Sequence, residues 1–155
     1  MVAGTAGTRE VDLVDFFVGP GGTVLGRDEL LSELHLPEPP GNSASAYIRF
    51  IPRNEMDIAV AGVASYLEMD PSTRVVKTAR IALAAVAPTP VRATEAERVL
   101  EGSAIDDALI ARAGEAAVES ARPISDIRGG AEYRKELVKV LTRRTLTSCV
   151  ERMDG

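Results

Sequence analysis

Two arginines near the middle of the chain are the side chains best suited to bind an anion, which is either a ligand or the carboxylate of a nearby aspartate. Arg49 and Arg53 lie at the end of an apolar segment, and Asp57 follows Arg53 by four residues. A guanidinium on a strand can donate two parallel hydrogen bonds to a carboxylate such as that of Asp57, or to an anionic ligand. From these residues alone the internal ion pair is the better-supported interpretation, and a ligand contact is the alternative.

A second group of cations recurs about every four residues near the C-terminus and could form a stripe facing a partner or a phosphate. Its members are Arg134, Lys135, Lys139, Arg143 and Arg144. Such spacing is also typical of the solvated face of an amphipathic helix. We therefore expect these side chains to face solvent.

The remaining polar candidates do not form a catalytic or metal-binding group. The segment Gly19-Pro20-Gly21-Gly22-Thr23 lacks the lysine of a phosphate-binding loop and predicts a turn. His35 has no cysteine or aspartate at catalytic spacing, so a surface histidine is expected. With one cysteine, Cys149, and one histidine, the chain is expected to hold no metal of its own.

Composition narrows the class of protein. A chain of 155 residues with 45% hydrophobic and 26% charged residues fits one globular domain, with or without a leading fragment. The net charge of −5 argues against nucleic-acid binding, and no apolar run is long enough to span a membrane. The N-terminus does not resemble a secretory signal, so we expect a cytoplasmic location and small-molecule or protein partners.

The first 45 residues predict little regular structure. We expect residues 1–8 to be poorly ordered, residues 14–25 to form a small hairpin, and residues 28–31 to make one helical turn. The Pro, Gly and Ser-rich residues 37–45 predict a domain boundary.

Three strands and then three helices are predicted beyond this boundary. The expected strands are residues 46–51, 57–67 and 75–86, the second being rich enough in alanine to leave a helix possible. In the first strand, Ile48 and Phe50 face the core and Tyr47 and Arg49 face away. Strands followed by helices indicate an α+β fold.

The three helices are predicted from their start signals and apolar periodicity. Thr94 and Glu97 form a capping box for a helix that ends near Gly102, and Ser103 with Asp106 repeats the signal more weakly. The last helix covers residues 131–150, with its buried side expected at Tyr133, Leu137, Val140, Leu141 and Cys149.

Read in chain order, short segments of this sequence resemble the FAD-binding medium subunits of the molybdenum hydroxylase family, which includes xanthine and carbon monoxide dehydrogenases. The segments are Asp15-Phe16-Phe17-Val18-Gly19, Thr23-Val24-Leu25, Glu29-Leu30-Leu31, Leu36-Pro37, Tyr47-Ile48-Arg49-Phe50, Pro52-Arg53, Met56-Asp57-Ile58-Ala59, Arg80-Ile81-Ala82-Leu83, Ala87-Pro88-Thr89-Pro90 with Arg92, Glu97 with Leu100 and Gly102, and Pro123, Ser125, Asp126 and Arg128 with Glu132-Tyr133-Arg134. No single segment is highly specific, but their shared order indicates the family.

This resemblance implies a fold and a role. It implies an antiparallel sheet of three to four strands packed on one side by three C-terminal helices, with residues 41–155 as the C-terminal domain and residues 1–40 as a disordered start and the tail end of the FAD-binding domain. It also implies electron transfer from iron–sulfur clusters through FAD to an external acceptor. The molybdenum cofactor and 2Fe-2S clusters are then expected on a large and a small partner subunit, with a homodimer of the complex possible.

Two residues are implied as flavin contacts by their positions in the matching segments. They are Leu31, on the segment beside the flavin ring, and Arg49, where lysine is commoner in the family. The glycine-rich loops that hold the FAD diphosphate in the family have no counterpart here, so only a partial site is expected. Two further departures are Ala84-Ala85, where the family often has glycine, and Gly129-Gly130, where Ala-Ser is common. The alternative function is a non-catalytic docking or dimerisation domain that binds no flavin alone.

Overall fold

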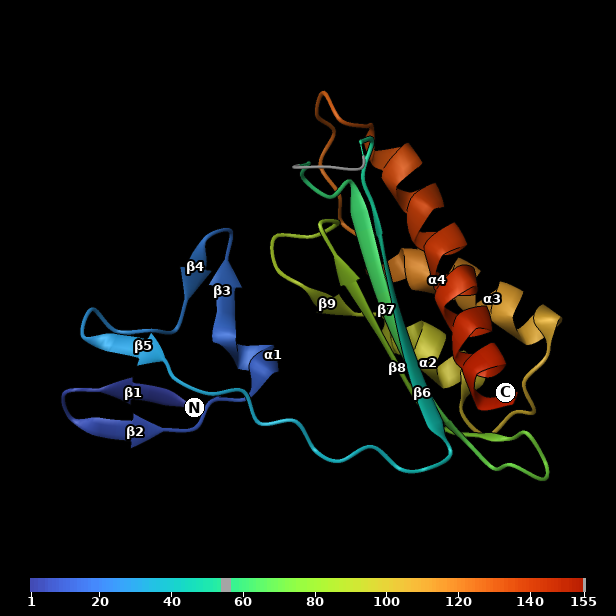
Figure 1. The fold of residues 1–155 in the computed structure, drawn as a ribbon. Helices are drawn as coiled ribbons and strands as arrows, with labels where there is room; N and C mark the ends of the chain where they lie inside the picture. The colour runs from blue at the N-terminus through green and yellow to red at the C-terminus, as the bar shows by residue number, and fades with distance from the viewer. Residues whose placement is uncertain (54–56, 155) are drawn as a thin grey trace. The chain divides into compact units, whose positions relative to one another are not determined.

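A computed structural model describes residues 1–53 and 57–154 and divides the chain into two compact units, Met1–Pro39 and Pro40–Gly155 (Figure 1). Met56, the first residue of one family-like segment, lies outside the described residues. Among the described residues, none of the helices combines the length and the apolar composition that a membrane crossing needs.

The first unit contains a small sheet and a hairpin. Its elements are β1 (Val2–Gly4), β2 (Gly7–Arg9), α1 (Leu13–Phe16), β3 (Phe17–Gly19), β4 (Gly22–Thr23) and β5 (Glu29–Leu31). The strands β2, β1 and β5 pair in that order, and β3 pairs with β4. The hairpin predicted around the Gly-Pro-Gly-Gly turn is confirmed.

Two sequence predictions for this unit are wrong. The start of the chain was expected to be poorly ordered and residues 28–31 to be helical, but β1 pairs with β2 and with β5, where Val2 lies opposite Leu31. Arg9 on β2 also donates to the Glu29 carboxylate from Nε at 2.7 Å and from Nη2 at 2.8 Å. These bonds lower the pKa of Glu29 to about 2. The β5 residues that pair with β1 lie at least 25 positions away along the chain, since Gly4 pairs with Glu29, so local sequence patterns do not reveal that pairing.

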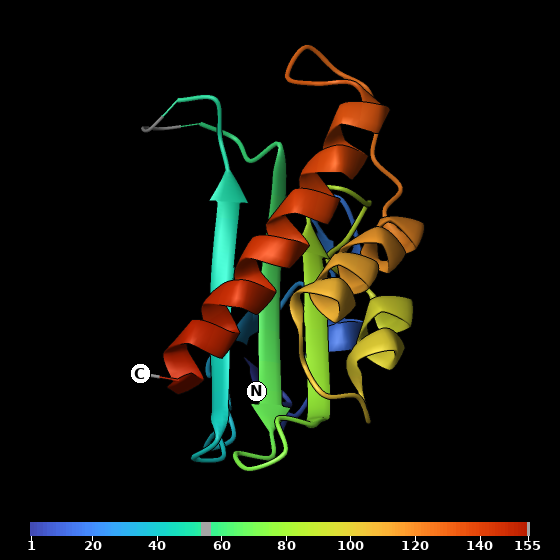
Figure 2. The ribbon, with the colours of Figure 1, turned by 90° about the vertical axis from the view of Figure 1, so that its right-hand side faces the viewer.

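The second unit is a four-stranded antiparallel sheet covered by helices. Its elements are β6 (Ser43–Phe50), β7 (Ala61–Met69), β8 (Val76–Ala84), β9 (Val91–Arg92), α2 (Thr94–Leu100), α3 (Asp107–Ala117), the 3-10 turn η1 (Val118–Ser120) and α4 (Ala131–Asp154). The strands pair in the order β6-β7-β8-β9, and α4 crosses one face of the sheet obliquely (Figure 2). The predicted α+β fold is confirmed.

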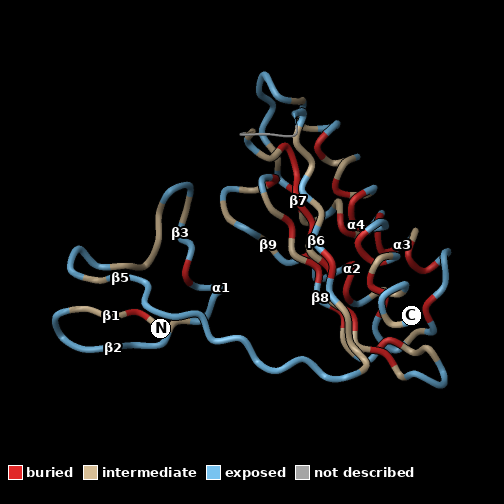
Figure 3. Tube along the Cα trace, in the orientation of Figure 1, coloured by how far each residue is buried: buried red, intermediate tan, exposed pale blue. Residues whose placement is uncertain are grey.

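The core lies between this sheet and the helices. Val63 and Leu67 on β7 and Ile81 and Leu83 on β8 are fully buried, whereas Ala64, Tyr66 and Ala82, which alternate with the core-facing residues, are only partly covered (Figure 3). This alternation follows from the two-residue period of a strand. Within the described residues of the second unit, one face of the sheet therefore has no helical cover.

The capping box predicted for α2 is wrong. Ala93 is the N-cap, and no side chain caps the helix. The Glu97 side chain instead accepts hydrogen bonds from Arg92 and, at 2.8 Å, from the backbone N–H of Ile81 on β8. An arginine fork is a stronger donor than an uncharged backbone amide, so Glu97 turns toward the sheet. The Glu97 carboxylate thus accepts from the Ile81 N–H, which β9 does not reach because it ends at Arg92.

The next two helices begin with side-chain acceptors. Asp106 is the N-cap of α3 and accepts from the Leu109 N–H at 2.7 Å. At the start of α4, the Ser125 hydroxyl accepts from the Ala131 N–H at 2.9 Å. Ser125 therefore supplies a hydroxyl acceptor that Gly129-Gly130 cannot provide.

The buried side of α4 differs in part from the predicted one. Leu141 and Cys149 are buried as expected, but Tyr133 and Val140 are exposed. The residues buried instead include Arg134, Thr142 and Thr145. Polar residues therefore occupy positions that a purely apolar stripe would not predict.

The two buried threonines of α4 provide a matched test of polar packing. Thr142 Oγ1 has no hydrogen-bond partner among the described residues, whereas Thr145 Oγ1 lies 2.7 Å from Ser65 Oγ and bonds the Leu141 carbonyl at 3.0 Å. We expect Thr142→Val to raise the free energy of unfolding by about 1 kcal/mol, because it removes an unsatisfied buried hydroxyl. Thr145→Val should lower it by about 1–2 kcal/mol, because Ser65 loses its acceptor. Urea denaturation would measure both, and equal effects would contradict this assignment.

Candidate functional site

Arg49 lies on the uncovered face of the sheet, as the sequence predicts. It is exposed near the end of β6, where its register partners are Gly62 on β7 and then Ala84 on β8. Among residues 1–53 and 57–154, Arg49 makes no ion pair. Its guanidinium is therefore available to an anionic ligand.

The register neighbours of Arg49 on the next two strands are small residues. A Cβ added to Gly62 would lie 3.1 Å from the Tyr47 hydroxyl oxygen, so the Tyr47 ring extends over this glycine. The next row along the strands contains Tyr47, Ala64, Ala82 and Arg92. The row after it contains Ser45, Tyr66 and Arg80.

We call this surface the open face: Ser45, Tyr47 and Arg49 on β6, Gly62, Ala64 and Tyr66 on β7, Arg80, Ala82 and Ala84 on β8, and Arg92 on β9. Part of it forms a shallow cavity of about 430 Å³ that has Tyr47, Tyr66 and Arg80 among its lining residues. Tyr47 is 60% exposed, so its ring is accessible. A flat floor of small residues with tyrosines and arginines at its rim can bind a planar anionic group by stacking and charge.

Two arginines, Arg53 and Arg92, form ion pairs with carboxylates of the chain. Arg53 Nε lies 3.1 Å from Asp57 Oδ2, which confirms the predicted internal ion pair and lowers the pKa of Asp57. Arg92 binds Glu97 through Nε at 2.6 Å and Nη2 at 2.7 Å. Arg49 and Arg80 lie on the open face, and in the described part of the chain neither forms an ion pair.

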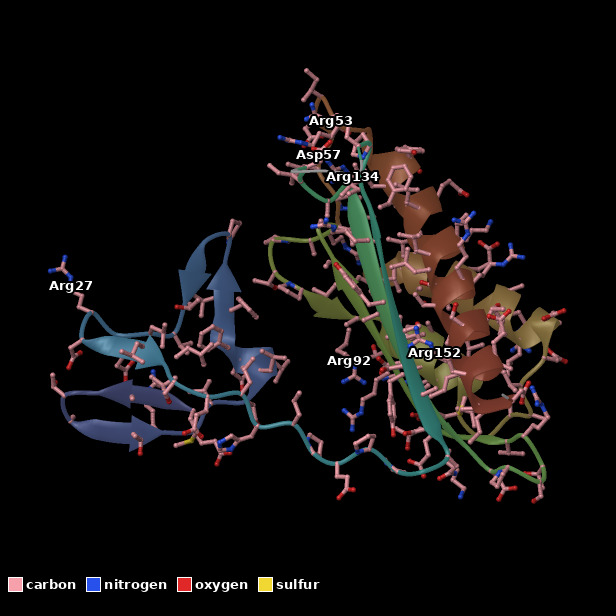
Figure 4. The ribbon with its side chains drawn as sticks, in the orientation of Figure 1. Arg27, Arg53, Asp57, Arg92, Arg134 and Arg152 are labelled. Carbon is pink, nitrogen blue, oxygen red and sulfur yellow. The ribbon has the colours of Figure 1, made fainter. Side chains whose placement is uncertain are left out.

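Arg134 was predicted to face solvent with the other cations of the last helix, and this prediction is wrong. It is 4% exposed, and its Nη2 lies 2.7 Å from Asp126 Oδ1. Its Nη1 donates to the carbonyl oxygens of Val60 at 2.7 Å and Ala85 at 3.3 Å. Figure 4 shows Arg134 near Arg53 and Asp57 at one end of the sheet. The helical periodicity alone does not predict that Arg134 is buried, because the carboxylate that pairs with it, Asp126, lies outside the helix.

Leu31, the second predicted flavin contact, lies in the first unit on β5. It is 43% exposed and lines an apolar cavity of about 380 Å³ together with Val2, Leu13, Phe16, Phe17 and Leu34. Leu31 and Arg49 thus belong to different units. His35 is exposed, as predicted, and its Nε2 lies 2.8 Å from Glu33 Oε2.

The remaining candidate residues, those for a metal site and Cys149, do not form a binding or catalytic site in the described part of the chain. Among the described residues, no group of three or more His, Cys, Asp or Glu side chains could hold a metal ion. Cys149 is buried, and desolvation raises the pKa of its thiol to about 11, so it is not a reactive nucleophile.

Comparison with known proteins gives a consistent result. The family model described as the CO dehydrogenase flavoprotein C-terminal domain matches residues 46–149. The carbon monoxide dehydrogenase medium chain of Afipia carboxidovorans is 37% identical over 145 residues, which cover 94% of this chain and 49% of that one. The putative xanthine dehydrogenase FAD-binding subunit of Escherichia coli is 28% identical over 150 residues, covering 96% and 51%.

Solved structures agree with the sequence matches. Carbon monoxide dehydrogenase from Hydrogenophaga pseudoflava superposes with a TM-score of 0.91 at 31% identity, covering 97% of this chain and 52% of that chain. Quinoline 2-oxidoreductase from Pseudomonas putida gives a TM-score of 0.88 at 32% identity, covering 98% and 52%. The chain therefore spans about half the length of the relatives it matches.

Proposed function

Because the chain belongs to the CO dehydrogenase flavoprotein C-terminal domain family, we propose that it is part of the FAD-binding medium subunit of a molybdenum hydroxylase. In this role it helps to pass electrons from iron–sulfur clusters through FAD to an external acceptor. The observation that carries the proposal is Arg49, an exposed guanidinium beside a floor of small residues on the open face.

The open face fits one wall of a flavin site. The isoalloxazine ring is planar and becomes negatively charged on reduction, and when bound it supplies the redox chemistry. Arg49 would stabilise that negative charge, and the exposed Tyr47 ring, which lies over Gly62, would present a planar face to the ligand. Arginine differs from lysine here because its guanidinium is a fixed planar fork.

We extend the proposal to the first unit. Residues 1–40 are assigned to the tail end of an FAD-binding domain, and residues 41–155 to the C-terminal domain. Leu31 is the apolar flavin contact of the first part. Its cavity is lined mainly by aliphatic and aromatic side chains, which is the usual composition of a cofactor pocket.

The partners follow from the same proposal. A molybdenum-cofactor large subunit and an iron–sulfur small subunit with 2Fe-2S clusters would complete the enzyme, and the complex would act in the cytoplasm, with a homodimer of the complex possible. Relatives described as a carbon monoxide dehydrogenase medium chain and a nicotine 6-hydroxylase medium subunit support such an assembly. The proposed complex needs neither nucleic acid nor a membrane.

Substitution of Arg49 tests the flavin contact. Titration of the chain with FAD, followed by flavin fluorescence, should give a dissociation constant that Arg49→Ala raises about tenfold, because one charge-assisted hydrogen bond is lost. Arg49→Lys keeps the positive charge and should change it by less than about threefold. Arg144→Ala removes an exposed arginine of α4 as a control. Equal effects of Arg49→Ala and Arg144→Ala would contradict the assignment.

A docking domain that binds no flavin alone is the second candidate. The exposed isoleucines Ile58, Ile124 and Ile127 favour it, since apolar side chains at a surface often mark a protein interface. Absence of FAD binding together with co-purification of a molybdenum-containing large subunit would favour this function. A chain that stays monomeric and does not bind the large subunit would argue against the docking function.

A further inference from the structure

We propose that Arg134 is a positioning residue that holds the row Arg49, Gly62 and Ala84 in place from the helical side of the sheet. The inference rests on the proposed function, because a fixed Arg49 matters only if it meets a ligand. Arg134 does not lie on the open face and does not itself contact a flavin in this proposal.

The first argument is the set of atoms that Arg134 joins. Its guanidinium binds the Val60 carbonyl, which directly precedes β7, and the Ala85 carbonyl, which directly follows β8. It also binds Asp126, whose Oδ1 accepts from the Arg128 N–H at 2.8 Å. One buried side chain therefore connects the ends of two strands to the loop before α4. A lysine has a single ammonium group and cannot make this set of contacts with the same geometry.

The second argument is the backbone of Ala85. Its φ of 63° lies in the left-handed region, which costs an alanine about 1 kcal/mol or more relative to glycine. Such a conformation persists only where surrounding contacts impose it. The hydrogen bond from Arg134 to the Ala85 carbonyl is such a contact. Ala85 is thus an alanine held under backbone strain directly after β8.

The third argument is the register of the sheet. Gly62, two residues after Val60, pairs with Arg49 on one side and with Ala84, next to Ala85, on the other. The Val60 N–H also donates to the Phe50 carbonyl at 3.0 Å, which ties the residue after Arg49 to the same position. Movement of Val60 or Ala85 would therefore displace the backbone that carries Arg49.

A double-mutant cycle between Arg134 and Ala85 tests the contact without any flavin. In the wild-type background, Ala85→Gly should raise the folding equilibrium constant about fivefold, because the left-handed strain is removed. In the Arg134→Met background, no hydrogen bond holds the Ala85 carbonyl, so Ala85 can leave the left-handed conformation. Ala85→Gly should then not raise the folding equilibrium constant. If Arg134→Met does not fold, Arg134→Lys replaces it in the cycle. An equal gain in both backgrounds would overturn the proposal.

A second cycle connects Arg134 to the flavin. Arg134→Lys should raise the FAD dissociation constant about tenfold, and the double variant with Arg49→Ala should bind no more weakly than Arg49→Ala alone. Arg144→Lys, at an exposed arginine of α4, is the matched control. Additive losses would show that Arg134 does not act through Arg49 and would overturn the positioning role. Absence of FAD binding by the wild-type chain would instead reject the proposed function, and the first cycle would then decide the contact.

Discussion

Glu97→Ala should lower the free energy of unfolding by about 3 kcal/mol. Glu97 is 7% exposed, and its carboxylate accepts hydrogen bonds from Arg92 and from the buried N–H of Ile81. Alanine would leave that N–H without an acceptor, because β9 ends at Arg92 and no strand residue can replace the carboxylate. Denaturant titration followed by circular dichroism would measure the loss.

The same helix provides two controls for Glu97. Glu95→Ala removes an exposed carboxylate that pairs with Arg98 and should change the free energy of unfolding by less than about 0.5 kcal/mol. Glu97→Gln keeps an oxygen that can accept from Ile81 and should give an intermediate loss. If Glu97→Ala is no more harmful than Glu95→Ala, Glu97 does not act as the edge partner of β8.

Gly114→Val should destabilise the contact between α3 and α4 by about 2–3 kcal/mol. A Cβ at Gly114 would lie 2.8 Å from Arg143 Cγ and 3.1 Å from the Lys139 carbonyl oxygen, so a side chain would push the helices apart. A backbone atom cannot move aside as the end of a flexible side chain can. The midpoint of thermal unfolding should therefore fall by several degrees.

Arg112→Val is a control for the introduction of a β-branched side chain on α3. Because valine has a higher helix propensity than glycine, propensity cannot explain a loss of stability in Gly114→Val. Arg112 is exposed on α3, and we expect the substitution to lower the free energy of unfolding by at most about 0.7 kcal/mol. A loss at Gly114 that matches the loss at Arg112 would mean that the helices do not need a glycine there.

Much of the second unit could be predicted from sequence because its signals are local. The alternation of Tyr47 to Phe50 placed Arg49 on the uncovered face, and the helical period of residues 131–150 located α4. Glu97 misled the prediction because a capping box and an ion pair use the same side chain. The choice depended on Arg92 and on Ile81, which become its neighbours only in the folded sheet.

Fewer contacts of the candidate site could be predicted from the sequence. Arg53 and Asp57 are four residues apart, so their ion pair could be anticipated. Arg134 contacts Val60, 74 residues away, and its burial depends on the combined positions of two strand ends and a loop. Likewise, nothing local indicates that Ala85 adopts a left-handed conformation. The flavin contacts Leu31 and Arg49 came from family resemblance and stay predictions.

The central claim is that the open face beside Arg49 contacts the flavin, and amide NMR shifts test it most directly. The ¹⁵N-labelled chain would be titrated with FAD to millimolar concentration, which detects weak binding by a partial site. The expected result is a set of shift changes centred on Arg49, Gly62 and Ala84 and on Tyr47 above them, reduced in Arg49→Ala. Shift changes confined to other surfaces, or none at all, would contradict the claim.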